Sequence, residues 1–63
     1  MQIHLWKIRE EKGLSLSKLA ELSELSKSNI NDVENGKTIP TLYTICKLAK
    51  SLDVKPEDLF DCN

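Results

Sequence analysis

The chain of 63 residues contains few of the residue types that mark several protein classes. Two glycines and two prolines are too few for a disordered or linker-like chain. One Trp, one Tyr and one Phe, with no apolar run near about 18 residues, exclude a membrane span. The first residues become charged at Lys7, so we expect no signal peptide. Cys46 and Cys62 are too few for a disulfide scaffold and lack metal-ligand spacing, so a reducing cytoplasm is the expected setting.

The net charge and the length of the chain limit the kinds of protein that it can be. Nine Lys and Arg residues stand against ten Asp and Glu residues, giving a net charge of −1, whereas small nucleic-acid binders are often basic. A chain this short buries only about 60% of its unfolded surface. It therefore has room for a single domain, residues 1–63, with one modest core and no deep cleft. We expect no enzyme, no cofactor, no metal site and no pocket for a small molecule.

Apolar residues follow helical spacing along the whole chain, which predicts an all-α fold. Leu5 and Ile8 share a face in a first helix that stops at Gly13. A second helix starts behind Ser15 as N-cap and runs to about Ser23. The longest stripe follows Thr41 as N-cap and comprises Leu42, Ile45, Leu48, Ala49 and Leu52. Residues 55–60 predict a final short helix, with Pro56 at its first position.

The middle segment predicts a helix that needs support from neighbouring elements. Ser26 is its N-cap, and Leu25 before the cap pairs with Ile30 after it as a hydrophobic staple. The helix ends at Asn35 and Gly36, so it has only about nine residues and would not be stable alone. We therefore expect it to pack against the rest of the chain from behind.

The exposed face of this middle helix is unusually rich in small polar groups. A helical wheel places Ile30 and Val33 on the buried side. The opposite side carries Lys27, Ser28, Asn31, Asp32 and Asn35. Ser and Asn are weak helix formers, and their donor and acceptor groups suit the edges of bases in a major groove. The alternative interpretation is the solvated face of a small helical bundle.

The second helix and the middle helix are separated by a break of only about three residues after Ser23, which is too tight for antiparallel packing and indicates a helix-turn-helix. The segments that carry a wider resemblance are IREEKG (8–13), LSLSKLA (14–20), SKSNINDVENGK (26–37), Pro40 and LAKSL (48–52). Together they are similar to the Cro/C1-type (XRE) helix-turn-helix family. The resemblance covers about residues 3–60, with the helix-turn-helix at about 15–35. It implies a compact five-helix, lambda-repressor-like domain.

The resemblance also implies a DNA-binding surface. The helix at about 27–34 would lie in the major groove with its N-terminal residues at base edges. Base contacts are expected from Lys27 to guanine, from Asn31 to adenine, from Asp32 to cytosine, and from Ser28. Phosphate contacts are expected from Ser15, Leu16, Ser17, Lys18, Asn35, Lys37, Thr38, Thr41 and Tyr43.

Several residues carry structural expectations instead. The resemblance implies a salt bridge between Arg9 and Glu34 that ties the first helix to the end of the middle helix. Glu24 stands where the family commonly has a glycine, so either it adopts the left-handed conformation or the turn differs. Trp6 is expected in core or rim packing, and Cys46 as a small buried side chain. A separate departure concerns Leu16, which stands where the family commonly has a phosphate-bracing glutamine.

Two classes of function follow from these patterns. The first is a sequence-specific, double-stranded-DNA-binding transcriptional regulator, expected to be a repressor because no residues remain for an effector domain. It would bind a palindromic operator as a homodimer through Val54, Leu59 and Phe60. The alternative is a protein-interaction module, such as an antitoxin or anti-repressor, on the same scaffold. Affinity for duplex DNA that falls steeply with salt would separate the first class from the second.

Overall fold

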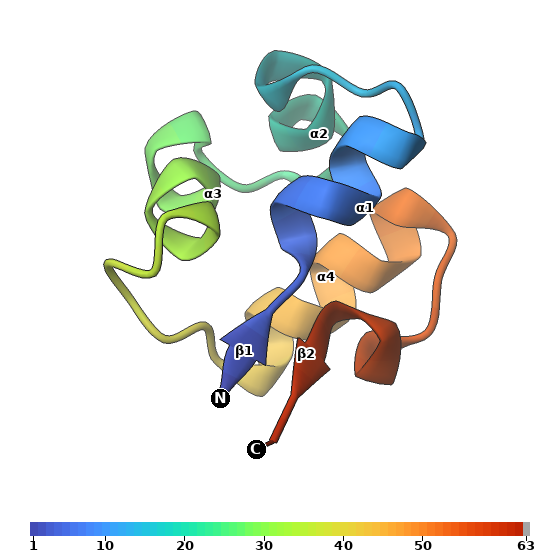
Figure 1. Ribbon diagram of the computed structural model, residues 1–63. Helices are drawn as coiled ribbons and strands as arrows, with labels where there is room; N and C mark the ends of the chain where they lie inside the picture. Colours follow the sequence, from blue (N-terminus) through green and yellow to red (C-terminus); the bar gives the residue numbers. More distant parts are fainter. Residues whose placement is uncertain (63) are drawn as a thin grey trace.

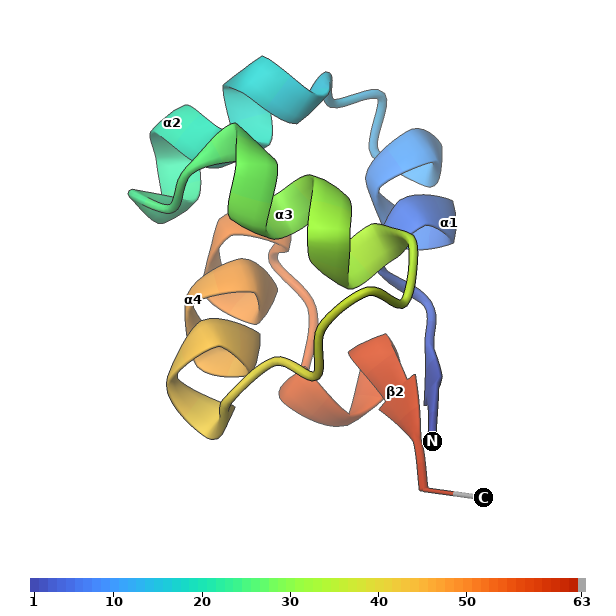
Figure 2. The same ribbon diagram turned by 90° about the vertical axis from the view of Figure 1, so that its left-hand side faces the viewer.

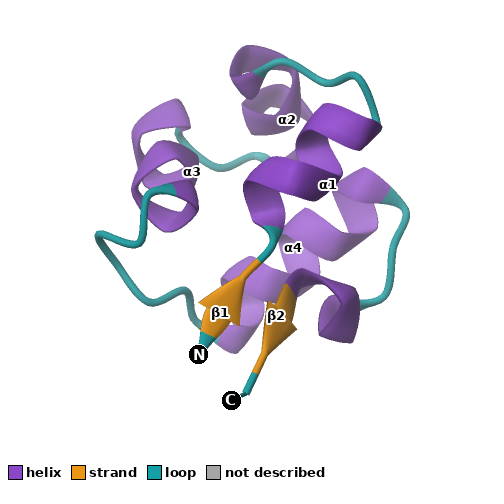
Figure 3. Ribbon diagram, viewed as in Figure 1, coloured by secondary structure: helices purple, strands orange, loops and turns teal. Residues whose placement is uncertain are grey.

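The computed structural model describes residues 1–62 and consists mainly of short helices (Figures 1 and 3). Four α-helices and one 3-10 helix, η1, are followed and preceded by single short strands. In chain order the elements are β1 (Gln2–Ile3), α1 (Leu5–Glu11), α2 (Leu16–Ser23), α3 (Lys27–Glu34), α4 (Leu42–Leu52), η1 (Pro56–Leu59) and β2 (Phe60–Asp61).

Three helices begin at hydroxyl side chains, as the sequence predicts. The Oγ of Ser15 accepts a hydrogen bond from the backbone N–H of Lys18 at 3.0 Å, which starts α2. The Oγ of Ser26 accepts one from Asn29 at 3.0 Å and starts α3 in the same way. Thr41 is the corresponding N-cap of α4. Each cap satisfies a first-turn N–H that has no partner within its helix.

α3 ends in a hydrogen-bonded turn that holds the following residue in place. Gly36 adopts a φ of +72°, a conformation that glycine tolerates without steric penalty. The N–H of Gly36 donates to the carbonyl of Val33, and the N–H of Lys37 donates to that of Asp32 at 2.9 Å. Lys37 is thereby positioned directly beside the C-terminal end of α3.

The expectation of five helices and no strands is wrong for residues 1–62. The last predicted helix is the 3-10 turn η1. The strands β1 and β2 pair in antiparallel orientation, Gln2 with Asp61 and Ile3 with Phe60. The side chains of His4 and Asp61 extend this pairing, with His4 Nε2 2.8 Å from Asp61 Oδ2. Strands of two residues are too short to show an alternating pattern, so only the tertiary contact reveals them.

The core is a single apolar cluster shared by every helix. Its buried members are Leu5, Leu19, Ile30, Val33, Ile45, Leu48, Ala49, Leu52 and Leu59. The expectation that Cys46 is buried is wrong, and Trp6 lies outside the core. Cys46 is exposed because it lies on the outer side of α4, away from the arc formed by Ile45 and Leu48. Trp6 is 57% exposed on the outer side of α1, so it is not part of the core.

The helices surround this core with α3 at the outside of the molecule. In Figure 1, α3 lies at the left and η1 at the right, with α1 and α4 between them. Figure 2 shows α3 crossing in front of the other elements, with α2 and the connection to α4 on either side of it. None of the helices in residues 1–62 has the length and apolar character that crossing a membrane requires.

Candidate nucleic-acid interface

α3 presents one face to the core and one to solvent. Ile30 and Val33 are 0% and 1% exposed, and Leu25 before the helix also packs against the core. These contacts come from side chains that are three residues apart in α3 or that flank its N-cap. They fix the helix while its other face remains free (Figure 2).

The predicted base-contacting residues lie together on this free face. Lys27, Ser28 and Asn31 are exposed, and Asp32 is half-buried. The side-chain amide of Asn35 donates to Oδ1 of Asn31 at 3.1 Å, which turns Oδ1 toward Asn35 and leaves the NH₂ group of Asn31 out of this hydrogen bond. The face therefore offers a cation, a hydroxyl, an amide and a carboxylate within about two helical turns.

Asn29 was not predicted as part of this surface, although it belongs to it. A shallow hollow of about 310 Å³ at the start of α3 is lined by Ser26, Ser28, Asn29, Asp32 and Thr38. The wheel assigned Asn29 to neither face because it precedes Ile30, at the boundary between the two. Its exposed amide adds one more donor and acceptor beside the predicted residues.

Two lysines at the edges of α3 are free of internal ion pairs. Within residues 1–62, no carboxylate lies within 4.0 Å of Lys27 or Lys37. Lys18 on α2 is paired only loosely, at 3.7 Å from Glu21, and both side chains are exposed. Positive charge therefore remains available at both ends of α3.

The first turn of α2 offers backbone N–H groups as hydrogen-bond donors. The N–H of Lys18 is already bonded to Ser15, whereas the N–H groups of Leu16 and Ser17 precede the first intrahelical bond. The positive end of the helix dipole adds to them. The Leu16 side chain itself packs against the core, so only its backbone can serve as the predicted phosphate contact.

At the other edge, the connection from α3 to α4 and the first turn of α4 contain further predicted phosphate contacts. Thr38 is exposed, and Tyr43 is 66% exposed with the Nζ of Lys47 5.5 Å from its ring centroid. The Thr41 hydroxyl is not free for the predicted phosphate contact. Its hydroxyl accepts from the Thr44 N–H and donates to the Thr44 hydroxyl, both at 3.1 Å, so it is engaged in starting α4.

Arg9 and Glu34 form the predicted salt bridge, which ties the C-terminal end of α3 to α1. Arg9 Nε donates to Glu34 Oε2 at 2.6 Å, and Nη2 donates to Oε1 at 3.2 Å. Arg9 Nη1 also donates to the carbonyl of Leu14 at 2.9 Å. The side-chain hydrogen bond to Glu34 raises the pKa of Arg9 further above its already high value, so the guanidinium stays charged. This paired geometry uses the planar fork of the guanidinium.

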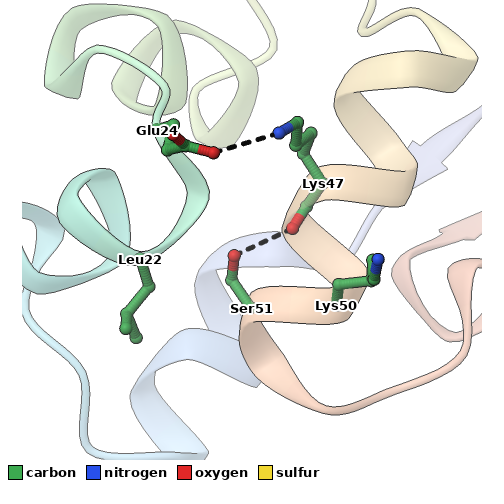
Figure 4. Close-up of a pocket in the computed structure, with 5 residues that line it drawn as sticks. All are labelled: Leu22, Glu24, Lys47, Lys50 and Ser51. Carbon is green, nitrogen blue, oxygen red and sulfur yellow. Dashed lines mark hydrogen bonds and ion pairs between the residues drawn. The ribbon is translucent and has the colours of Figure 1, made fainter.

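Glu24 adopts the left-handed conformation between α2 and α3, with φ of +63°. Of the two alternatives that the sequence left open, a left-handed Glu24 or a different turn, the structure has the first. Its carboxylate lies 3.2 Å from Nζ of Lys47 across a hollow of about 370 Å³, which Leu22, Lys50 and Ser51 also line (Figure 4). The hydrogen bond to Glu24 raises the pKa of Lys47.

Of the three residues predicted for a dimer contact, one is completely buried. Leu59 is 0% exposed and belongs to the core, so its assignment to a dimer interface is wrong. Val54 and Phe60 are half-buried and pack against the same core. A chain of this length needs these apolar side chains to complete its interior. Within residues 1–62, no three His, Cys, Asp or Glu side chains lie close enough to hold a metal ion.

The comparison with known families fits the geometry of α2 and α3. The sequence profile of the helix-turn-helix family matches residues 7–59. The chain belongs to the Cro/C1-type (XRE) helix-turn-helix family. In this helix-turn-helix domain, α2 is the first helix of the motif, Glu24 and Leu25 form the turn, and α3 is the second helix.

Curated relatives of this helix-turn-helix domain are regulators. It is 38% identical over 50 residues to the transcriptional regulator SutR of Escherichia coli, covering 79% of this chain and 28% of SutR. It is 42% identical over 53 residues to the transcriptional repressor RghR of Bacillus subtilis, covering 82% of this chain and 39% of RghR. The chain thus spans less than half of the length of these relatives.

Solved structures share the fold at similar identity. The restriction-modification controller protein C.AhdI from Aeromonas hydrophila has a TM-score of 0.87 and 44% identity, covering 90% of this chain and 86% of that chain. The N-terminal DNA binding domain of SinR from Bacillus subtilis has a TM-score of 0.85 and 34% identity, covering 92% and 86%. The fold is therefore that of the helix-turn-helix domains of transcriptional regulators.

Proposed function

We propose that this helix-turn-helix domain binds double-stranded DNA sequence-specifically and regulates transcription as a repressor, as a homodimer on a palindromic operator. The observation that carries the proposal is the outward face of α3. Ile30 and Val33 are buried beneath that face, while Lys27, Ser28 and Asn31 are exposed on it. A single helix supported in this way fits the major groove of B-DNA, which is about 12 Å wide.

Each side chain on this face has a chemical role in reading a base pair. The Lys27 ammonium donates to guanine O6 or N7, and the Asn31 amide pairs with adenine. Because Asn35 donates to Asn31 Oδ1, the NH₂ group of Asn31 remains outside this hydrogen bond and can donate to the base. Asp32 accepts from cytosine N4, and Ser28 donates or accepts.

The flanks of α3 supply sequence-independent contacts to phosphates. The free N–H groups of Leu16 and Ser17, with Ser15 and Lys18, lie at the start of α2. Lys37, Thr38, Asn35 and Tyr43 lie beyond the other end of α3. The acidic residues Glu57 and Asp58 lie on η1, on the opposite side of the domain from α3 (Figure 1). Beside α3, the two unpaired cations Lys27 and Lys37 outnumber the single carboxylate of Asp32, even though the net charge of the chain is −1.

The relatives support the regulatory part of the proposal. RghR is a transcriptional repressor, and the SinR structure is a DNA binding domain. A monomer of this size makes few phosphate contacts, whereas a two-fold dimer reads two half-sites about one helical turn apart. Binding two half-sites together raises the effective concentration of the second domain. This gain in affinity is the reason that the proposal includes a homodimer and a palindromic operator.

Selection of bound duplexes from a random pool tests the proposal. We expect an enriched sequence with two inverted half-sites, bound with an affinity that falls steeply as salt is added. Lys27→Ala combined with Lys37→Ala should abolish binding at moderate salt. The matched control is Lys50→Ala combined with Lys55→Ala, which removes the same charge from exposed positions away from α3 and should retain binding. No enrichment, or binding to a protein partner without salt dependence, would refute the proposal in favour of an interaction module.

A further inference from the structure

A row of three side chains reaches from the turn between α2 and α3 to the start of α4. The Glu24 carboxylate lies 3.2 Å from Nζ of Lys47, across the hollow between the turn and α4 (Figure 4). The same Nζ lies 5.5 Å from the centroid of the Tyr43 ring, which is within the range of a cation–π attraction. Tyr43 and Lys47 are four residues apart in α4 and therefore share a face of that helix. One ammonium group thus connects the turn of the motif with an aromatic ring in the first turn of α4.

Stability alone does not explain a glutamate at position 24. At a φ of +63°, a side chain with a β-carbon is disfavoured relative to glycine. The ion pair offsets little of this cost, because the Glu24 side chain is 79% exposed and exposed ion pairs contribute little to stability. The clearer consequence of Glu24 is that it fixes the ammonium group of Lys47, whose side chain is only 32% exposed.

We propose that Glu24 and Lys47 are positioning residues that hold the Tyr43 ring in the orientation in which its hydroxyl contacts a DNA phosphate. This inference rests on the proposed function, which includes Tyr43 among the phosphate contacts. Lys47 attracts the ring through its positive charge, and Glu24 keeps the ammonium group beside the ring. The pKa of Lys47 is raised, first by its hydrogen bond to Glu24 and further by Tyr43, so the ammonium group stays charged.

The Tyr43 side chain needs such support because the rest of the domain leaves it largely free. It is 66% exposed, and an exposed side chain can populate several χ1 rotamers. Fixing one rotamer before the duplex arrives removes part of the ordering cost of binding. Figure 2 shows the turn between α2 and α3 and the helix α4 on the same side of α3. The row of side chains therefore lies beside one edge of the proposed DNA face.

Lys47 acts through Tyr43 in this proposal and does not bind a phosphate itself. Its charge is already paired with Glu24, whereas Lys27 and Lys37 have no carboxylate within 4.0 Å among residues 1–62. A cation that binds a phosphate adds to the salt dependence of binding, whereas a cation that orients a neutral tyrosine does not. The slope of affinity against salt therefore separates the two roles.

NMR of the full chain without DNA measures the orientation of Tyr43. Three-bond couplings should show one dominant χ1 rotamer of Tyr43 in the unaltered chain. Glu24→Gln and Lys47→Met should each give averaged couplings, because each removes one charge from the row. The matched control is Lys50→Met, at an exposed position one turn further along α4, which should leave the rotamer unchanged. Averaged couplings in the unaltered chain, or one dominant rotamer in every variant, would overturn the proposal.

Binding to the selected duplex tests the consequence for affinity. Glu24→Gln combined with Lys47→Met leaves the net charge unchanged and should weaken binding about twofold to tenfold for each bound domain, with the same salt slope. In a chain that already carries Tyr43→Ala, the same two substitutions should have no further effect. An equal loss in both backgrounds, with a smaller salt slope, would show that Lys47 binds a phosphate itself and would contradict the proposal.

The two measurements separate failure of this proposal from failure of the proposed function. The rotamer of Tyr43 is measured without DNA, so its dependence on Glu24 and Lys47 holds or fails whether or not the chain binds a duplex. An unaltered chain that binds no duplex would refute the DNA-binding function. A chain that binds its duplex with the same affinity after loss of both charges would refute the positioning role alone. Circular dichroism checks that each variant remains folded.

Discussion

Arg9 on α1 and Glu34 at the end of α3 are joined by two hydrogen bonds, of 2.6 Å and 3.2 Å. The two side chains are only 10% and 5% exposed, so the pair is largely shielded from water. The N-terminal end of α3 is held by Ser26 and by the packing of Leu25. The helix is thus fixed at both ends, and its outward face has one orientation relative to the start of α2.

Loss of this bridge should destabilise the fold. Glu34→Gln removes the shielded carboxylate beside Arg9 and leaves only the exposed carboxylate of Glu10, 3.3 Å away, as its counter-charge, so it should lower the free energy of unfolding by about 1–3 kcal/mol. Urea denaturation measures the change. The control Glu21→Gln breaks the exposed pair with Lys18 and should change stability by less than about 0.5 kcal/mol. Equal effects of the two substitutions would contradict a structural role for Arg9 and Glu34.

The left-handed turn residue should be a site of stabilisation. Glu24 has a φ of +63°, which is unfavourable for a side chain with a β-carbon. Glu24→Gly should raise the free energy of unfolding by about 0.5–1 kcal/mol, because glycine accepts this φ readily. Glu24→Gln keeps the backbone conformation and removes only the exposed pair with Lys47, so thermal denaturation should show little change. A destabilising Glu24→Gly would mean that the side chain matters more than the backbone.

Leu59 should behave as a core residue and not as an interface residue. Leu59→Ala removes a side chain that is 0% exposed and should lower the free energy of unfolding by about 2–5 kcal/mol. The loss should be the same at low and high protein concentration, because it arises within one chain. Leu42→Ala, at an 80% exposed position, should have little effect on the unfolding of the monomer. A concentration-dependent loss for Leu59→Ala would restore this residue to a dimer contact.

Base-reading and phosphate-binding residues should differ in how they affect affinity. Asn31→Ala should cost about 1–3 kcal/mol and relax preference at one base pair of each half-site. Lys37→Ala should weaken binding to all duplexes alike and reduce the salt slope by about one for each bound domain, or about two for the proposed dimer. Fluorescence anisotropy on a panel of single-base variants, repeated at several salt concentrations, separates these patterns. Equal loss on all duplexes for Asn31→Ala would remove it from the reading surface.

Local signals were sufficient to predict the helices that carry the candidate site. Ser15, Ser26 and Thr41 act as caps through their own side chains, and the spacing of Ile30 and Val33 defines the buried side of α3. These features depend on residues within one or two helical turns, which a sequence displays directly. The exposed polar face of α3 followed from the same spacing.

The features that the sequence did not reveal depend on distant contacts. His4 and Asp61 are 57 positions apart, and nothing local indicates that their strands pair. From the sequence alone, the side chains of Cys46 and Leu59 could each be buried or exposed. The packing of α4 and η1 determines that Cys46 is exposed and Leu59 is buried. The conformation of Glu24 likewise could not be chosen from sequence, because the turn could have rearranged to avoid it.

The most direct test of the account is an NMR titration of the labelled domain with a selected duplex. We expect the largest amide shifts at Leu16, Ser17, Lys27, Ser28 and Lys37, with side-chain amide shifts at Asn31. Shifts centred instead on the hollow between Leu22 and Lys50, with α3 unaffected, would show that the outward face of α3 does not contact the duplex.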